Sequence, residues 1–393
     1  MELFSSARSL VQQHEPDRPV TCLRPEMANR AATYFKNRFP GKILYAVKAN
    51  PRLEIIDSIY NAGINHFEIA SLSEAELLYG RYPECHLAYM HPIKSRGSIK
   101  NAYFKYGVRD FALDSVDELN KILVSTDYAE DLNLFVRLAV PNDYAEFNLS
   151  QKFGASPAKV AHILSCIRPV SKKIGICFHV GSQCMSPSSF SSALKTVGQI
   201  IRSSGLILDI IDVGGGFPSI YPNLAPPPLD AYLDEIRTIK ERIPVINKCE
   251  IWAEPGRALV AEGASTLVRV DHRKEDHLYI NDGTYGSLFD AGFPGFVFPV
   301  KPIRKAGNFS ASLSPYSLFG PTCDGLDYMK GPFILPEDMK EGDYIEIGQT
   351  GAYGCTMRTR FNGFYSDRTV ILSDLPILSM YQRSSHEWQL VGG

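Results

Sequence analysis

The sequence lacks an excess of charge of either sign, because 41 basic and 43 acidic residues leave a formal net charge of −2. Nucleic-acid-binding proteins usually carry a net basic surface, so this balance argues against that class. No apolar run is long enough to span a membrane. Residues 1–19 have no charged start followed by an apolar core, so they do not resemble a signal peptide. We expect a cytoplasmic protein that binds neither nucleic acid nor membrane.

Paired metal-binding cysteines are also absent. The eight cysteines form no CxxC pair, which argues against a zinc site, and we expect free thiols and no bound metal. Hydrophobic residues make up 45% and charged residues 21%, which is normal for a globular protein and excludes a disordered chain. A length of 393 residues predicts two domains rather than one core.

Eight short apolar runs recur in the first three-fifths of the chain. Segments with helical spacing separate them, such as 71–80 and 115–125, the second of which has Ser115 as a plausible N-cap. Eight strands alternating with helices are typical of a (β/α)8 barrel. A doubly wound parallel sheet is the alternative, but it requires no particular number of strands, so the count favours the barrel. The runs are ILYAVK (43–48), HFEIA (66–70), HLAYM (86–90), DFALD (110–114), NLFVRLA (133–139), IGICFHV (174–180), LDIIDVG (208–214) and EIWAEPG (250–256).

Residues with distinct chemistry stand at or just past the C-terminal ends of six of these runs. In a barrel, those ends form the face on which active sites are built. Any one of them is explained by the ordinary change to polar residues where a strand ends, but six together are not. We therefore place the candidate site there, at Lys48, Glu68, Arg137, His179, Gly214 to Gly216 and Glu254.

Lys48, in YAVKAN, follows an apolar strand that buries its aliphatic stem. Burial disfavours an ammonium, so we expect the pKa of Lys48 to fall and its neutral amine to be available for a Schiff base. The alternative is a lysine whose charged end reaches solvent at the end of a strand, which is the more common case for a lysine considered alone.

A glycine-rich segment, DVGGGFP (212–218), follows the seventh run. Three glycines let the backbone approach a ligand and point N–H groups at an anion such as phosphate, although a tight turn explains them about equally well. The pattern is not GxGxxG, which disfavours a dinucleotide site. Gly256 and Arg257, in EPGRA after the eighth run, would complete a phosphate site, because that site usually lies in the loops after strands seven and eight.

Three further side chains fit a flat, phosphorylated ligand. Glu254 should point into the barrel mouth, where its carboxylate can hold a protonated pyridine nitrogen and make that ring a strong electron sink. The alternative is an ion pair between Glu254 and Arg257 or another cation. His179 can stack on such a ring, although a lone histidine near an apolar run is more often a core residue. Ser182 can donate to a phosphate oxygen.

After about residue 264 the long helical patterns stop and strand-like runs with turns follow, which predicts a mostly antiparallel β domain. We expect an N-terminal segment, 1–25, that packs on this domain, a barrel from 26 to 263 and the β domain from 264 to 393. The loop GPTCDGLDYM (320–329) combines a thiol, Cys323, with a carboxylate, Asp324. Cys323 can deliver a proton to carbon and Asp324 can bind a cationic substrate tail, whereas a simple turn is the structural alternative.

Together these segments resemble the fold-type III pyridoxal-phosphate decarboxylases, most closely the ornithine decarboxylase group. This resemblance implies an alanine racemase-like (β/α)8 barrel with a C-terminal β domain, pyridoxal 5′-phosphate as cofactor, and decarboxylation of L-ornithine to putrescine in polyamine biosynthesis. Ten segments occur in the family's order and spacing, from about residue 20 to about residue 370: YAVKAN, FEIAS, KFG, HVGSQ, DVGGGFP, AEPGR, NDGTYGS, GPTCDGLD, GAYG and FNGF.

The resemblance also implies roles for single residues. Lys48 resembles the Schiff-base lysine, His179 the residue stacked on the ring, and Glu254 the partner of the ring nitrogen. Cys323 resembles the proton donor and Asp324 the partner of the distal amine. Further implied cofactor contacts are Glu68 and Arg137, with Ser182, Gly214, Gly215, Gly216, Gly256, Arg257 and Tyr353 at the phosphate, and the implied substrate contacts include Tyr285 and Phe361.

In this family the barrel of one subunit meets the β domain of another. The resemblance therefore implies a homodimer in which Cys323 and Asp324 enter the partner's site, and a salt bridge between Lys152 and Asp327 across the interface.

One departure leaves the substrate open. Eukaryotic ornithine decarboxylases carry a second acid shortly after YGS, whereas here Asp290 lies too close to YGS to match and later positions are apolar. Ornithine and lysine differ by one methylene and are then hard to separate. Diaminopimelate and arginine are weaker alternatives, since CDG rather than a CES-like sequence argues for a simple cationic tail. Glu254 disfavours a racemase, and the retention of Lys48, Glu254 and Cys323 disfavours a regulatory binding protein.

Overall fold

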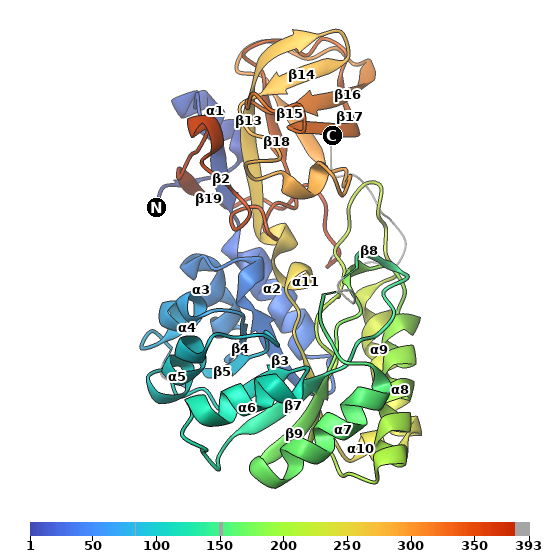
Figure 1. Cartoon of the computed structure of the whole chain (residues 1–393). Helices are drawn as coiled ribbons and strands as arrows, with labels where there is room; N and C mark the ends of the chain where they lie inside the picture. Colours follow the sequence, from blue (N-terminus) through green and yellow to red (C-terminus); the bar gives the residue numbers. More distant parts are fainter. Residues whose placement is uncertain (83, 149–151, 382–393) are drawn as a thin grey trace.

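The computed structural model describes residues 1–82, 84–148 and 152–381. It has two layers, a barrel surrounded by helices and a β domain stacked on one end of that barrel (Figure 1). Within the described ranges, no helix is both long and apolar enough to cross a membrane.

Eight parallel strands close into the barrel. Each overlaps one of the eight predicted runs, so the predicted (β/α)8 architecture is confirmed and the doubly wound sheet is wrong. In chain order the strands are β3 (Lys42–Ala46), β4 (His66–Ile69), β5 (His86–Tyr89), β6 (Asp110–Leu113), β7 (Asn133–Arg137), β9 (Lys173–Cys177), β11 (Ile210–Asp212) and β12 (Glu250–Ala253).

Side chains alternate between the two sides of these strands, as the period of two requires. On β7, Phe135 belongs to the cluster inside the barrel, whereas Leu134 and Val136 belong to the larger cluster between strands and helices. The interior is therefore filled with side chains and leaves room for a ligand only at the strand ends. The inner cluster consists of Leu44, Ala88, Met90, Ala112, Phe135, Cys177, Ile210 and Trp252.

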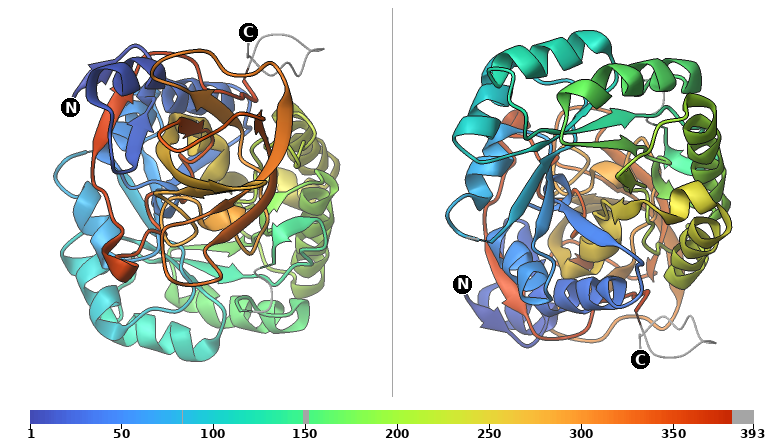
Figure 2. Two further views of the ribbon diagram at one scale, coloured as in Figure 1. Left: turned by 90° about the horizontal axis from the view of Figure 1, so that it is seen from above. Right: turned by 90° about the horizontal axis from the view of Figure 1, so that it is seen from below.

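The outer helices form a ring around the strands (Figure 2). Ser115 caps α6 as predicted, because its hydroxyl accepts a hydrogen bond from the Glu118 amide. Ser71 caps α4 in the same way. The helices are α2 (Pro25–Lys36), α3 (Leu53–Asn61), α4 (Leu72–Leu78), α5 (Arg96–Phe104), α6 (Val116–Ser125), α7 (Pro157–Ile167), α8 (Ser188–Ser204) and α9 (Leu229–Arg242), with the short α10 (Pro244–Asn247) and α11 (Arg257–Val260).

The β domain is a nine-stranded, mostly antiparallel sheet to which the N-terminal segment contributes β1 and β2 beside α1 (Ala7–His14). The predicted domain limits at residues 26 and 264 stay a prediction about which parts fold as units. The strands are β1 (Leu3–Phe4), β2 (Val20–Leu23), β13 (Ala264–Lys274), β14 (His277–Ile280), β15 (Val300–Ile303), β16 (Leu313–Phe319), β17 (Tyr328–Pro336), β18 (Tyr344–Ile347) and β19 (Thr369–Leu372).

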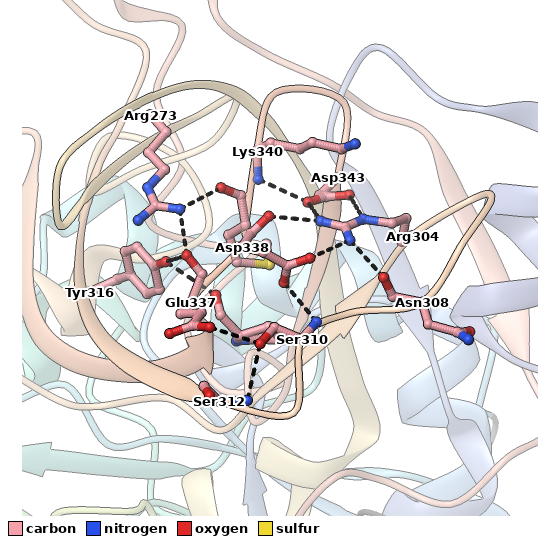
Figure 3. A network of polar contacts seen from close by, with 12 residues as sticks. Arg273, Arg304, Asn308, Ser310, Ser312, Tyr316, Glu337, Asp338, Lys340 and Asp343 are labelled. Carbon is pink, nitrogen blue, oxygen red and sulfur yellow. Dashed lines mark hydrogen bonds and ion pairs between the residues drawn. The ribbon is translucent and has the colours of Figure 1, made fainter.

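Two arginines of this domain, Arg273 and Arg304, form hydrogen bonds with neighbouring loops (Figure 3). Arg304 donates from Nε to Asp343 Oδ1 at 2.8 Å and from Nη1 to Asp338 Oδ2 at 2.7 Å. Arg273 Nη1 donates to the carbonyls of Glu337 and Met339. The bonds of Arg304 connect the end of β15, and those of Arg273 connect β13, to the turn between β17 and β18.

One arginine joins the N-terminal strand to the rest of the sheet. Arg24, directly after β2, donates to Glu346 Oε1 at 2.6 Å, to Ser265 Oγ at 2.8 Å and to Asp374 Oδ1 at 2.7 Å. The side chains of Arg24 and Glu346 are each only 2% exposed. Removing one partner of such a pair leaves the other charge buried and unpaired.

We therefore expect Arg24→Ala to lower the free energy of unfolding by about 3 kcal/mol or more. The control is Arg81→Ala, because the pair of Arg81 with Asp57 is exposed to solvent and should matter far less. Urea denaturation of both variants checks this, and an equal loss in the two would contradict it.

Candidate active site

A cavity of about 370 Å³ lies where the C-terminal ends of the barrel strands face the β domain. Residues from both parts of the chain form its wall, and eight of the residues singled out from the sequence are among them. These eight are Lys48, Glu68, Arg137, His179, Ser182, Glu254, Arg257 and Tyr353.

Lys48 lies on a single 3-10 turn, η1 (Val47–Ala49), that directly follows β3. Its Nζ is 2.7 Å from Oε2 of Glu68, the residue before the end of β4. Burial opposes the charge on Lys48, but the carboxylates of Glu68 and Glu254 outweigh burial and raise the pKa of Lys48. The predicted lowering of this pKa is therefore wrong, because the prediction counted burial and left out the neighbouring acids.

Glu254 follows β12 and is buried next to Asp212, the last residue of β11. Burial raises the pKa of Glu254 well above its ordinary value, and Asp212 and Glu68 raise it further. Burial also raises the pKa of Asp212 to about 6, although hydrogen bonds with the Gly214 amide and with Glu254 oppose this. Burial and mutual repulsion therefore favour the protonated form of these carboxyl groups, and among the described residues neither Glu254 Oε1 nor Asp212 Oδ2 has a hydrogen-bond partner.

His179, just past β9, presents a neutral ring to the cavity. Its burial, with Arg137 and Lys48 nearby, holds its pKa well below the ordinary value. Its Nδ1 accepts a hydrogen bond from the Gly181 amide at 3.0 Å, which fixes the ring. A methyl group on Gly215 would lie 2.9 Å from His179 Nε2, so the glycine segment packs directly against this ring.

The glycine segment is explained largely by the fold. Gly214 has a φ of +68°, and a Cβ there would lie 1.9 Å from the Phe178 carbonyl oxygen. The tight turn therefore accounts for Gly214 without a ligand. Neither Gly256 nor the three glycines of this segment belong to the described cavity wall, so the phosphate nest stays a prediction.

Arg257 begins α11, for which Gly256 is the N-cap. Its Nη1 donates to Tyr221 Oη and to Asp290 Oδ2, both at 2.8 Å, while its buried Nε has no partner in the described chain. The sequence-based alternative that pairs Arg257 with Glu254 is not what the structure shows. Arg257 is an arginine in the cavity wall with a donor to spare, which suits it to holding an anion.

A second cluster gathers four more of the predicted residues, away from this wall. Tyr285 donates to Asp324 Oδ2 at 2.6 Å, and its ring lies 5.1 Å from that of Phe361. The backbone amide of Cys323 donates to Asn362 Oδ1 at 3.0 Å, and Cys323 itself is exposed. None of these residues lines the described cavity of its own chain.

Asp327 holds that loop in place through hydrogen bonds. Its buried carboxylate accepts hydrogen bonds from the Thr284 amide and from the amide and hydroxyl of Thr322. Lys152 is exposed, with Nζ 5.1 Å from the Phe153 ring. The predicted pairing of Lys152 with Asp327 of another subunit stays a prediction.

Several residues at the site were not selected from the sequence. Asp212 and His91 follow the same rule as the predicted residues, since each stands at or just past the end of a barrel strand, and that rule could have found them. Asp290 also lines the cavity, although its spacing from YGS does not match that of the family's second acid. Phe147 lies on β8 (Ala145–Phe147), which pairs with β10 (Ser182–Cys184) in a ribbon that the sequence did not predict.

Comparison with known proteins adds independent findings. Residues 26–261 match the family model described as "Pyridoxal-dependent decarboxylase, pyridoxal binding domain". The lysine/ornithine decarboxylase of Selenomonas ruminantium is 32% identical over 343 residues, which cover 85% of this chain and 84% of that protein. The ornithine decarboxylase of Panagrellus redivivus is 31% identical over 368 residues, 87% of this chain and 82% of that one. The crystal structure of a Vibrio vulnificus lysine/ornithine decarboxylase complexed with cadaverine superposes with a TM-score of 0.80 at 28% identity, covering 94% of this chain and 100% of that chain.

The acid pair at Asp212 predicts a specific pH dependence of stability in the protein without ligand. Folding raises the pKa of Asp212 from 3.8 to about 6, so its favourable contribution is complete below the lower value and is lost as pH rises through the higher one. Asp212→Asn lacks this titration. We compare the free energies of unfolding of the unmodified protein and of Asp212→Asn at each pH. As pH rises from 3.8 to about 6, the unmodified protein should lose about 2 kcal/mol of stability relative to the variant. Urea denaturation across that range checks it, and a difference independent of pH would contradict it.

Proposed function

The chain belongs to the family of pyridoxal-dependent decarboxylases, and from this premise we propose that it converts L-ornithine to putrescine with pyridoxal 5′-phosphate. The observation that carries the proposal is one cavity wall with three separate features. These are a lysine amine, a buried glutamate whose Oε1 has no hydrogen-bond partner among the described residues, and an arginine whose Nε has none there either.

These features fit the three polar parts of the cofactor. Lys48 would hold the aldehyde carbon. Glu254 would hold the ring nitrogen, whose N–H would supply the donor that Glu254 Oε1 lacks among the described residues. When bound, the cofactor supplies a ring that accepts the electrons left on the substrate by the departing carboxyl group. Arg257 would hold the phosphate together with Ser182, Gly214, Gly215, Gly216, Gly256 and Tyr353, while His179, Glu68 and Arg137 would flank the ring and the lysine.

Glu68 has a further task in this proposal. Because the pKa of Lys48 is raised, its ammonium must lose a proton before the amine can react. Glu68 Oε2, at 2.7 Å, is positioned to accept that proton. Glu68 thus both raises the pKa of Lys48 and can accept the proton that Lys48 must lose.

Glu254 and Asp212 determine the charge of the ring. Burial, Asp212 and Glu68 all disfavour the negative charge on Glu254, so a cation placed against Glu254 would be strongly favoured because it offsets this penalty. Glu254, with Asp212 behind it, would therefore hold a proton on the ring nitrogen, which would strengthen the ring as an electron acceptor.

We further propose a homodimer with shared active sites. Cys323 and Asp324 are held in place by hydrogen bonds and lie outside their own chain's cavity, Cys323 exposed and Asp324 half-buried. Leu326, in the same loop, is 76% exposed, as expected of a surface that a second copy covers. In the partner's site, Cys323 would return a proton to Cα and Asp324 would bind the distal amine, with Tyr285 and Phe361 beside it.

L-Lysine is the second candidate substrate. Asp324 is the acid of the loop cluster assigned to the distal amine, and one methylene in an apolar pocket is worth only about 1–3 kcal/mol. The Selenomonas ruminantium relative is itself named for both lysine and ornithine. The placement of Asp324 and the name of this relative therefore support activity on both substrates as the alternative.

Release of carbon dioxide and amine from four substrates tests the proposed activity. We expect ornithine or lysine to have a kcat/KM at least about tenfold above that of arginine and diaminopimelate, because Asp324 is placed to bind a simple ammonium tail. Arginine or diaminopimelate as the preferred substrate would contradict the assignment of Asp324. A protein that binds the cofactor but decarboxylates none of the four would contradict the proposed function.

The shared site predicts complementation between two inactive proteins. Random exchange of Lys48→Ala with Cys323→Ala subunits gives half heterodimers with one intact site each, so about a quarter of full activity should return. The matched control mixes Lys48→Ala with the double variant Lys48→Ala/Cys323→Ala, which can form no intact site. Mass spectrometry verifies subunit exchange, and exchange without recovery would count against shared sites.

A further inference from the structure

The wall of the cavity contains an ion pair that the proposed reaction does not use. Arg257 Nη1 lies 2.8 Å from Asp290 Oδ2, and the two side chains are only 4% and 7% exposed. Arg257 is the residue proposed to hold the cofactor's phosphate. In the protein without cofactor, the guanidinium therefore already has an anionic partner.

The carboxylate is placed by a loop rather than by the barrel. Asp290 lies on the 3-10 turn η4 (Phe289–Ala291), and its carbonyl accepts from the Phe296 amide at 2.9 Å. Asn223 anchors the following residues through bonds with the Gly295 carbonyl and the Val297 amide. Phe289 lines the cavity, whereas Phe293 is fully exposed. Asp290 therefore joins Arg257 to a loop of the β domain rather than to the barrel.

Asp290 and a phosphate would compete for the guanidinium of Arg257, because both are anions. A buried arginine without a partner is costly, so Asp290 stabilises the empty site. A phosphate at Arg257 would place a second anion close to this carboxylate in a site that screens charge poorly. The same ion pair that stabilises the empty site therefore opposes the entry of phosphate.

We propose that Asp290 is an internal competitor of the cofactor's phosphate for Arg257, and that it leaves Arg257 when the cofactor binds. Asp290 is thus a positioning residue that sets cofactor affinity through Arg257. This inference rests on the proposed cofactor site, in which Arg257 binds the phosphate.

Asp290→Asn tests the competition, since the amide keeps the size of the side chain and removes its charge. In cofactor-free protein we expect the Kd for pyridoxal 5′-phosphate and the Kd for inorganic phosphate each to fall about tenfold. Absorbance titration measures the first and calorimetry the second. A purely structural role for Asp290 would weaken binding or leave it unchanged, and either result overturns the proposal.

Asp343→Asn is the matched control, because it removes the charge from another buried aspartate–arginine pair of the β domain, at Arg304 (Figure 3). It should leave both dissociation constants within about twofold of their original values, since that pair does not line the cavity. Tightening by Asp343→Asn equal to that by Asp290→Asn would overturn the proposal, because the effect would then not be specific to Arg257.

Hydrogen exchange on the unsubstituted protein decides the matter if Asp290→Asn does not fold. Saturating inorganic phosphate should speed exchange of the Phe296 amide, because that amide is bonded to the residue that phosphate displaces. Slower or unchanged exchange would overturn the proposal. Failure of the underlying function is distinct: unsubstituted protein that binds inorganic phosphate but not pyridoxal 5′-phosphate contradicts the proposed function, whereas cofactor binding without tightening in Asp290→Asn contradicts only the competition.

Discussion

The site depends on one ammonium held among carboxylates at the mouth of the barrel. Lys48 is kept charged at the barrel mouth by Glu68 at 2.7 Å, with Glu254 and its partner Asp212 behind it. Barrel closure makes this cluster possible, because β12 pairs with β3 and β11, and β3 pairs with β4, so residues some 200 positions apart in the chain meet. Without a ligand, burial and mutual repulsion disfavour the charges on these carboxylates. A ligand that binds the lysine amine and donates a hydrogen bond to the acids would remove this cost.

Much of this arrangement is predictable from the sequence because it follows from topology. Eight runs with helices between them predict a barrel, and a barrel places the ends of its strands on one face. That rule alone is enough to bring Lys48, Glu68, His179 and Glu254 to one cavity. The cap at Ser115 is predictable for a different reason, because the residues that determine it are neighbours in the chain.

What the sequence did not predict depends on contacts between side chains of different elements. The pKa of Lys48 is raised rather than lowered because acids from β4 and from the end of β12 surround it, and burial considered alone gives the wrong sign. Arg257 pairs with Asp290 rather than Glu254 because a 3-10 turn of the β domain reaches the cavity wall. The loop that carries Cys323 is held by hydrogen bonds within the β domain and does not line the cavity of its own chain. A single chain therefore does not place this thiol in its own site.

The most direct measurement of the central claim locates the cofactor on the chain. Borohydride reduction of the protein loaded with pyridoxal 5′-phosphate fixes the cofactor to the amine that holds it, and peptide mass spectrometry then identifies that amine. The account predicts a single modified peptide that carries the added mass on Lys48. Modification of a different lysine, such as the buried Lys94, or no fixed cofactor at all, would contradict it.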